Sequence, residues 1–196
     1  MPRTLFNTPV RRLRAVSLAV ALLAPNIFGA QMLAAQDTAS QPERVSNGAR
    51  FGQWVVNCQA LAVNETACML EQRLVRSDDG AFLTDLLVFS SPDGSKNYLS
   101  ARVPVGVYFP HGFAFRPVAD EDSEIRLIWQ SCSPDRCEAL IELDAETLAG
   151  LEAAEGGLIA GYRPGILAEP VVFRFSVAGA SAGLAALEAS RALSDE

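Results

Sequence analysis

The chain has 196 residues, with 16 basic and 23 acidic side chains and a formal net charge of −7. This acidic balance argues against nucleic acid and anionic lipid as partners, because both require clustered Lys and Arg. The sequence also lacks the phosphate-binding, Ser-hydrolase and zinc-protease motifs of common enzyme classes. Length and composition therefore favour one acidic domain with a sizeable core.

The first 35 residues have the features of an export signal. Four arginines and no acidic residue accompany a short apolar stretch over 15–23, and small residues follow as far as Ala35. The stretch is too short to cross a hydrocarbon layer, which needs about 20 apolar residues. We expect a cleavable signal peptide at 1–35. The alternatives are an uncleaved inner-membrane anchor and, given Arg11-Arg12, a twin-arginine signal.

Removal of that segment would leave 12 basic and 23 acidic residues, a net charge of −11. The mature protein would have no transmembrane span and would be periplasmic or secreted. The polar segment 36–49 shows no hydrophobic period, so we expect it to be flexible. The remaining residues, 50–196, are expected to form a single domain.

Short apolar runs separated by turn signals predict many strands in this domain. The expected strands cover 51–58, 68–75, 82–90, 98–103, 125–132, 137–143, 158–163 and 171–177. The stretch 104–115 has Pro or Gly every few residues, so it predicts extended pieces around a turn at 110–112 and no helix.

Helix is expected only late in the chain. Asp144 is a candidate N-cap for a helix as far as Ala153, with Leu148 and Leu151 facing inward. A second helix is expected from Ser181. Many short strands with two minor helices are typical of an all-β sandwich or barrel.

Four cysteines form two close pairs, Cys58 with Cys68 and Cys132 with Cys137. Each pair flanks a predicted turn, and an exported chain with an even number of cysteines favours structural disulfides. Three connectivities are possible, and pairing in sequence order needs no long-range contact. A zinc site and a redox site are the alternatives, but the spacings fit neither well, and no C-x-x-C motif occurs.

Few other residues suggest chemistry. His111 is the only histidine, and its place between Pro110 and Gly112 is typical of a turn. The acidic run 120–124 lacks the regular spacing of a calcium loop. The sequence therefore predicts no catalytic residue, no metal site and no cofactor.

The chain resembles the invasion-associated locus B family of exported bacterial proteins. The resemblance lies in four places: Phe51-Gly52-x-Trp54-x-Val56-x-Cys58 with Cys68-Met69-x-x-Gln72; Val103-Pro104-Val105-Gly106-Val107; Cys132-x-x-x-x-Cys137-x-Ala139; and the final stretch from Phe173 to Leu187.

The resemblance implies an immunoglobulin-like β-sandwich with the four cysteines as structural bridges. It also implies a link to host-cell invasion, although the acidic balance here argues against direct adhesion to an anionic cell surface. The leading hypothesis is a non-enzymatic protein that binds another protein or an envelope component through loops or a sheet face. The alternatives are a periplasmic enzyme with an unrecognised carboxylate or histidine site, and a structural or stress-related envelope factor.

N-terminal sequencing of the protein isolated from its native host tests the export signal. We expect the mature chain to begin at Gln36, because signal peptidases cut after small residues such as Ala35. A mature protein that begins at Met1 would contradict cleavage.

Overall fold

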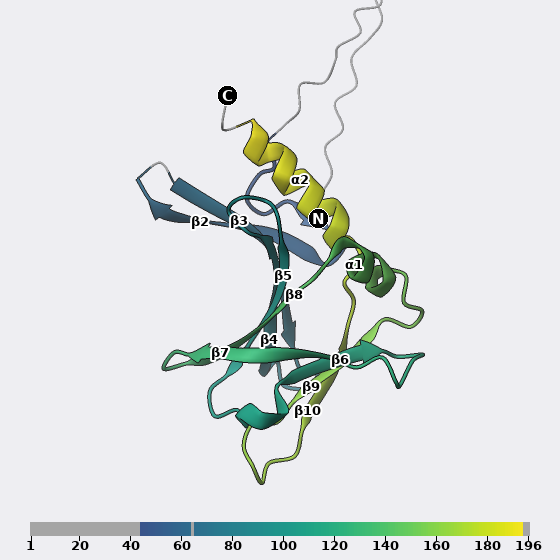
Figure 1. Cartoon of the computed structure of the whole chain (residues 1–196). Helices are drawn as coiled ribbons and strands as arrows, with labels where there is room; N and C mark the ends of the chain where they lie inside the picture. Colours follow the sequence, from purple (N-terminus) through teal and green to yellow (C-terminus); the bar gives the residue numbers. More distant parts are fainter. Residues whose placement is uncertain (1–43, 64, 194–196) are drawn as a thin grey trace, which may run out of the picture. The chain divides into compact units, whose positions relative to one another are not determined.

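The computed structural model describes residues 44–63 and 65–193 (Figure 1). The expected signal peptide, and residues 36–43 of the segment expected to be flexible, lie outside the described residues. The described part contains ten strands, two α-helices and one short 3-10 helix, η1 (Phe109–His111). The strands are β1 (Arg50–Phe51), β2 (Trp54–Ala62), β3 (Glu65–Val75), β4 (Phe82–Ser90), β5 (Asn97–Pro104), β6 (Phe113–Pro117), β7 (Ile125–Cys132), β8 (Arg136–Glu142), β9 (Leu158–Tyr162) and β10 (Val171–Phe175).

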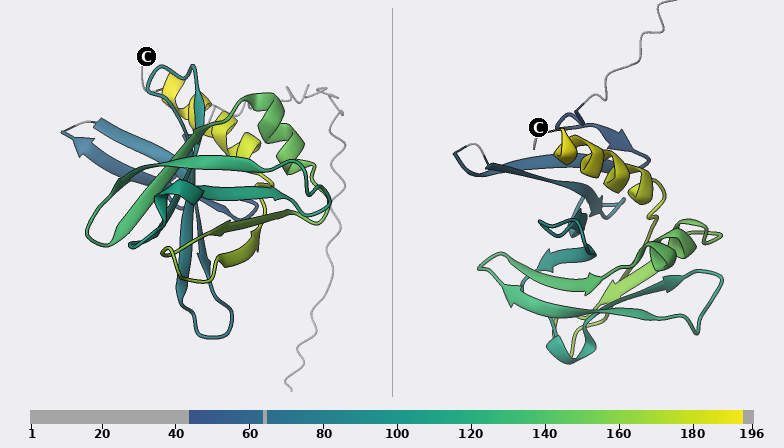
Figure 2. Two further views of the ribbon diagram at one scale, coloured as in Figure 1. Left: turned by 60° about the horizontal axis from the view of Figure 1, so that its bottom comes forward. Right: turned by 45° about the horizontal axis from the view of Figure 1, so that its top comes forward.

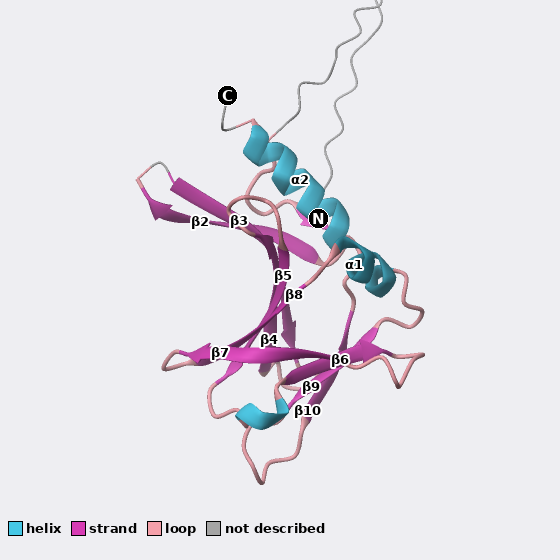
Figure 3. Cartoon of the chain, in the orientation of Figure 1, coloured by secondary structure: helices cyan, strands magenta, loops and turns pink. Residues whose placement is uncertain are grey.

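All ten strands join one antiparallel sheet in the order β1-β2-β3-β4-β5-β8-β7-β6-β9-β10. The helices are α1 (Ala145–Glu152) and α2 (Ala180–Ala192), and Figure 3 shows how strongly strand outweighs helix. The prediction of an all-β fold with two helices and disulfide staples is therefore confirmed. The continuous sheet folds across itself (Figure 2), which is consistent with the expected immunoglobulin-like sandwich.

Strand β7 is the place where the sheet passes from one half to the other. Its first residues pair with β6, with Leu127 opposite Phe113. Its later residues pair with β8, with Ile128 opposite Leu140. The β7–β8 register also shifts between Trp129 and Ser131, an irregularity of the kind that increases local twist.

The two halves of the sheet bury one shared apolar core. The long half contributes alternate residues from β2 to β5, as a strand with one buried face requires. The short half contributes aromatic side chains, and Phe115 meets Phe175 edge to face at 5.7 Å between ring centroids. The fully buried side chains include Trp54, Val56, Leu70, Leu86, Val88, Leu99, Val103, Phe113, Leu127 and Leu158.

Helix α1 begins as the sequence predicts. The Asp144 side chain accepts a hydrogen bond from the Thr147 backbone N–H at 2.7 Å, and this bond lowers the pKa of Asp144. Leu148 and Leu151 are both buried. The N-cap and the inward leucines therefore fix both the start and the rotation of the helix.

The structure differs from the sequence prediction in two places. The turn-rich stretch 104–115, where no helix was expected, contains the three-residue helix η1, because Pro110 fits the first turn of a helix. Residues 44–49, expected to be flexible, are held by other elements. The Gly48 N–H donates to the Val56 carbonyl at 2.8 Å, and the Val45 N–H donates to the Ser190 hydroxyl at 3.2 Å. Tertiary contacts therefore hold residues 44–49 in place, although their sequence has no hydrophobic period.

Helix α2 lies against the inner face of the first strands. A β-carbon built on Gly183 would lie 2.7 Å from Leu70 Cδ1, so the helix approaches the sheet closely at this point. Neither helix of the described residues is long and apolar enough to span a bilayer.

Gly183→Val should lower the free energy of unfolding by about 1–3 kcal/mol, because the added side chain would overlap Leu70 in a filled core. Gly150→Val in α1 is the matched control, since no atom outside the neighbouring backbone of the helix lies within 4 Å of a β-carbon there. The control should change stability by less than about 0.5 kcal/mol. Urea unfolding measures both, and equal effects would contradict close packing at Gly183.

Candidate binding surface

Two loops lie side by side at one end of the sheet, as Figures 1 and 2 show. One loop contains η1 and joins β5 to β6, and the other joins β9 to β10. The Tyr108 N–H donates to the Arg163 carbonyl at 2.8 Å, which joins the two loops directly. A second contact comes from the sheet, where the Phe109 ring lies 6.3 Å from the ring of Trp129.

These loops expose four large apolar side chains, which we call the loop-end patch. Their exposed fractions are 45% for Val105, 54% for Phe109, 64% for Ile166 and 93% for Leu167. The β5–β6 loop contains no acidic residue, and the β9–β10 loop contains one, Glu169. Exposed apolar side chains that lie close together on a protein surface often mark an interaction site.

Two buried hydrogen-bond donors belong to the same end of the domain. Trp129 Nε1 and Arg163 Nε have no hydrogen-bond acceptor among the described residues. Trp129 is only 8% exposed, and its ring contacts Phe109 of the loop-end patch. Because most buried polar groups in proteins are paired, each such donor requires an explanation.

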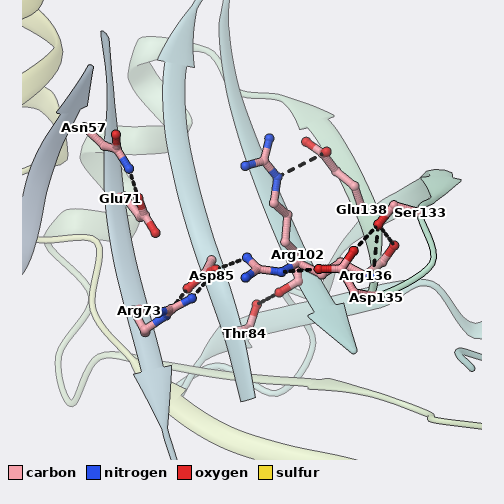
Figure 4. Close-up of polar contacts among 10 residues, drawn as sticks. All are labelled: Asn57, Glu71, Arg73, Thr84, Asp85, Arg102, Ser133, Asp135, Arg136 and Glu138. Carbon is pink, nitrogen blue, oxygen red and sulfur yellow. Dashed lines mark hydrogen bonds and ion pairs between the residues drawn. The ribbon is translucent and has the colours of Figure 1, made fainter. Parts of the chain in front are cut away.

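A network of charged residues borders this end on the outer face of the sheet (Figure 4). At its centre is Asp85 of β4, whose side chain is 1% exposed. Arg73 Nε donates to Asp85 at 2.8 Å, and Arg136 Nη1 donates to the other carboxylate oxygen at 2.5 Å. The bond to Asp85 raises the pKa of Arg73 above its ordinary value.

The ring of Phe82 completes this site. The guanidinium carbons of Arg73 and Arg136 each lie 5.3 Å from its centroid, within the range of a cation–π interaction. The carboxylate and the ring together hold both arginines in place. We call Arg73, Phe82, Asp85 and Arg136 the arginine clamp.

Strand register arranges further charges beside the clamp. Arg73, Asp85, Arg102 and Glu138 are cross-strand neighbours on four successive strands. Their charges therefore alternate in sign across the sheet, and Arg102 Nε donates to Glu138 at 3.2 Å. Opposite charges on neighbouring strands stabilise this register. Because Arg136 lies opposite Pro104, the clamp adjoins the loop that carries Val105.

The four cysteines predicted to form structural bridges make two disulfides. Cys58 bonds to Cys68 between β2 and β3, and Cys132 bonds to Cys137 between β7 and β8. In each bridge the two Cα atoms are 4.0 Å apart. Both bridges follow sequence order, and each joins directly opposite residues of a hairpin.

The other residues considered from sequence are not brought together. The His111 ring lies 5.1 Å from the Tyr108 ring in the 104–112 loop. In the acidic run, Asp120 accepts hydrogen bonds from Asp122 N–H and the Ser123 hydroxyl, so it forms a local turn. Within residues 44–63 and 65–193, no group of three or more His, Cys, Asp and Glu side chains could hold a metal ion.

Sequence reasoning missed the arginine clamp and the loop-end patch. Asp85 had a visible signal, because it is the only acidic residue in the apolar strand Phe82–Ser90. A lone carboxylate in a buried strand requires a cationic partner. The identity of that partner had no signal, since Arg136 is 51 residues away in the chain.

The geometry defines the class of protein as a disulfide-stapled all-β domain with an exposed apolar loop end. Its sequence matches the family described as "Invasion associated locus B (IalB) protein" over residues 54–188. The chain therefore belongs to the invasion-associated locus B family. A search of curated proteins finds no match.

A solved structure agrees with this assignment. It is the crystal structure of invasion associated protein B from Bartonella henselae, with 20% sequence identity and a TM-score of 0.60. The alignment covers 76% of this chain and 99% of that one. At this level of identity the comparison establishes a shared fold, while the match over residues 54–188 confirms the family expected from the sequence motifs.

Asp85→Ala should lower the free energy of unfolding by about 1–3 kcal/mol, because it leaves Arg73 and Arg136 without their carboxylate. The partial exposure of both arginines limits the loss. Glu142→Ala, which removes the exposed Lys96–Glu142 pair, should cost less than about 1 kcal/mol. Guanidinium chloride unfolding compares them, and equal losses would show that the clamp does not stabilise the fold.

Proposed function

We propose that this protein is an exported, non-enzymatic binding protein that holds a protein or an envelope component on its loop-end patch. The observation that carries the proposal is the exposure of Val105, Phe109, Ile166 and Leu167 on two loops joined by a hydrogen bond. Loops held by a rigid sheet are a common place for binding residues.

The chemistry of the patch indicates what kind of surface it binds. The partner would cover the apolar side chains of the loop-end patch with an apolar surface of its own. The two loops carry one carboxylate, that of Glu169, and one guanidinium, that of Arg163, so they present little net charge to a partner. The arginine clamp would keep the adjoining strands rigid and so reduce the entropic cost of binding.

Export to the periplasm or beyond forms part of the same proposal. The basic and apolar residues of 1–35 support it, as do two disulfides within one domain. The proposal includes a cleaved signal at 1–35 and a single functional domain over 50–196. A link to host-cell invasion rests on family membership alone.

The competing hypothesis is a periplasmic enzyme that uses His111 or a carboxylate. His111 is the only imidazole available for proton transfer, and it lies on the loop that carries Phe109. His111→Ala distinguishes the two readings, since a binding surface built on apolar contacts should keep its partner after this change.

The proposed function is tested by mild crosslinking in the native envelope, followed by purification of the tagged protein. We expect a reproducible partner at fixed stoichiometry with the wild type and with His111→Ala. The double variant Ile166→Ser/Leu167→Ser should reduce its yield at least about tenfold, because apolar contacts at the centre of an interface dominate affinity.

The matched control is Leu61→Ser/Val63→Ser, which removes another exposed apolar pair, near the β2–β3 turn. It should leave the yield of the partner unchanged. Loss of the partner in the control but not in the loop variant would place binding on the β2–β3 hairpin. Absence of any partner with the wild type would contradict a binding role.

A further inference from the structure

The two edges of the sheet differ in whether another segment of the chain covers them. At the other edge from β10, the short strand β1 pairs with the start of β2, and the backbone of Val56 exchanges hydrogen bonds with Gly48 and Ala49, each at 2.8 Å. Farther along, the Cys58 N–H donates to the Asn47 side chain at 3.0 Å, and the register shifts between Ala60 and Ala62. Covering segments and bulges of this kind prevent a second chain from pairing at an edge.

The β10 edge has no such cover among the residues that the structure describes. The sheet order ends at β10, which pairs with β9 only. A β-carbon built on Gly161 would lie 3.0 Å from the Val171 carbonyl oxygen, and one built on Gly157 would lie 3.0 Å from that of Phe175. These two carbonyl groups therefore point toward β9.

Because strand residues alternate in direction, Val172 and Arg174 point their N–H and C=O groups away from β9. Across residues 44–63 and 65–193, no backbone hydrogen bond outside the strand pairs reaches either residue. Both side chains are exposed, with Val172 at 59%. Unpaired backbone groups in a regular strand are a template for another strand.

We propose that β10 pairs with β10 of a second copy of this chain, which joins two sheets edge to edge around a twofold axis at Phe173. In this antiparallel register, Val172 lies opposite Arg174 of the second copy. Both residues of that pair have outward backbone groups, so each donates and accepts a hydrogen bond across the axis.

The side chains of β10 favour a second copy of this chain as its pairing partner. Each Arg174 faces a valine, so no like charges lie directly opposite, and its aliphatic stem can cover Val172. A register in which Val172 lies opposite itself would place Arg174 against Pro170, which has no N–H to donate. The edge is thus complementary to itself in one register. Since β10 has only five residues, the dimer should be weak and dependent on concentration.

The test is sedimentation velocity of the purified, disulfide-intact protein between about 5 and about 500 μM. The wild type should shift from monomer to dimer across this range. Val172→Pro should raise the dimer Kd at least about tenfold, because it removes an outward N–H and leaves the bonds to β9 in place. Val172→Thr keeps the N–H and should change the Kd less than about twofold.

Amide exchange followed by NMR gives a second measurement that needs no variant. The amides of Val172 and Arg174 should exchange more slowly at high protein concentration, while exposed amides elsewhere should not change. A wild type that stays monomeric, a Val172→Pro protein that still forms dimers, or unchanged exchange at both amides would each overturn the proposal. This inference does not depend on the loop-end patch, so either proposal can fail alone.

Discussion

The passage of one sheet from β8 to β6 through β7 is the constraint on which the rest of the structure depends. Leu127 pairs with one half of the sheet and Ile128 with the other, so the two halves can face each other without a break in hydrogen bonding. Their inner faces then bury the shared core, which supplies most of the stability of a domain of this size. The same passage brings the β5–β6 and β9–β10 loops together.

Charge serves a different purpose from the core in this protein. Asp85 interrupts an apolar strand and is buried, but its carboxylate pairs with two arginines, and the Phe82 ring contacts both guanidinium groups. Such a site contributes little net stability compared with apolar packing, but it penalises any strand register that separates the partners. The alternating charges on β3, β4, β5 and β8 therefore specify how the strands align.

The two disulfides act locally, since each closes a hairpin between directly opposite residues. They restrict the unfolded chain over short loops and do not connect the halves of the sheet. Besides the passage through β7, packing and single hydrogen bonds connect the halves, such as Trp54 Nε1 to the Val177 carbonyl and Tyr162 to the Leu83 carbonyl. Burial of Tyr162 raises the pKa of its phenol.

The sequence by itself determined the all-β class, most strand positions, the N-cap at Asp144 and the candidate cysteine pairs. Each of these depends on residues close together in the chain, where periodicity and turn chemistry act. Only the tertiary structure decided the partners of Asp85, the contacts that hold residues 44–49 in place, the loop-end patch and the uncovered β10 edge. Those features depend on which distant strands become neighbours, and long-range pairing leaves no local pattern in the sequence.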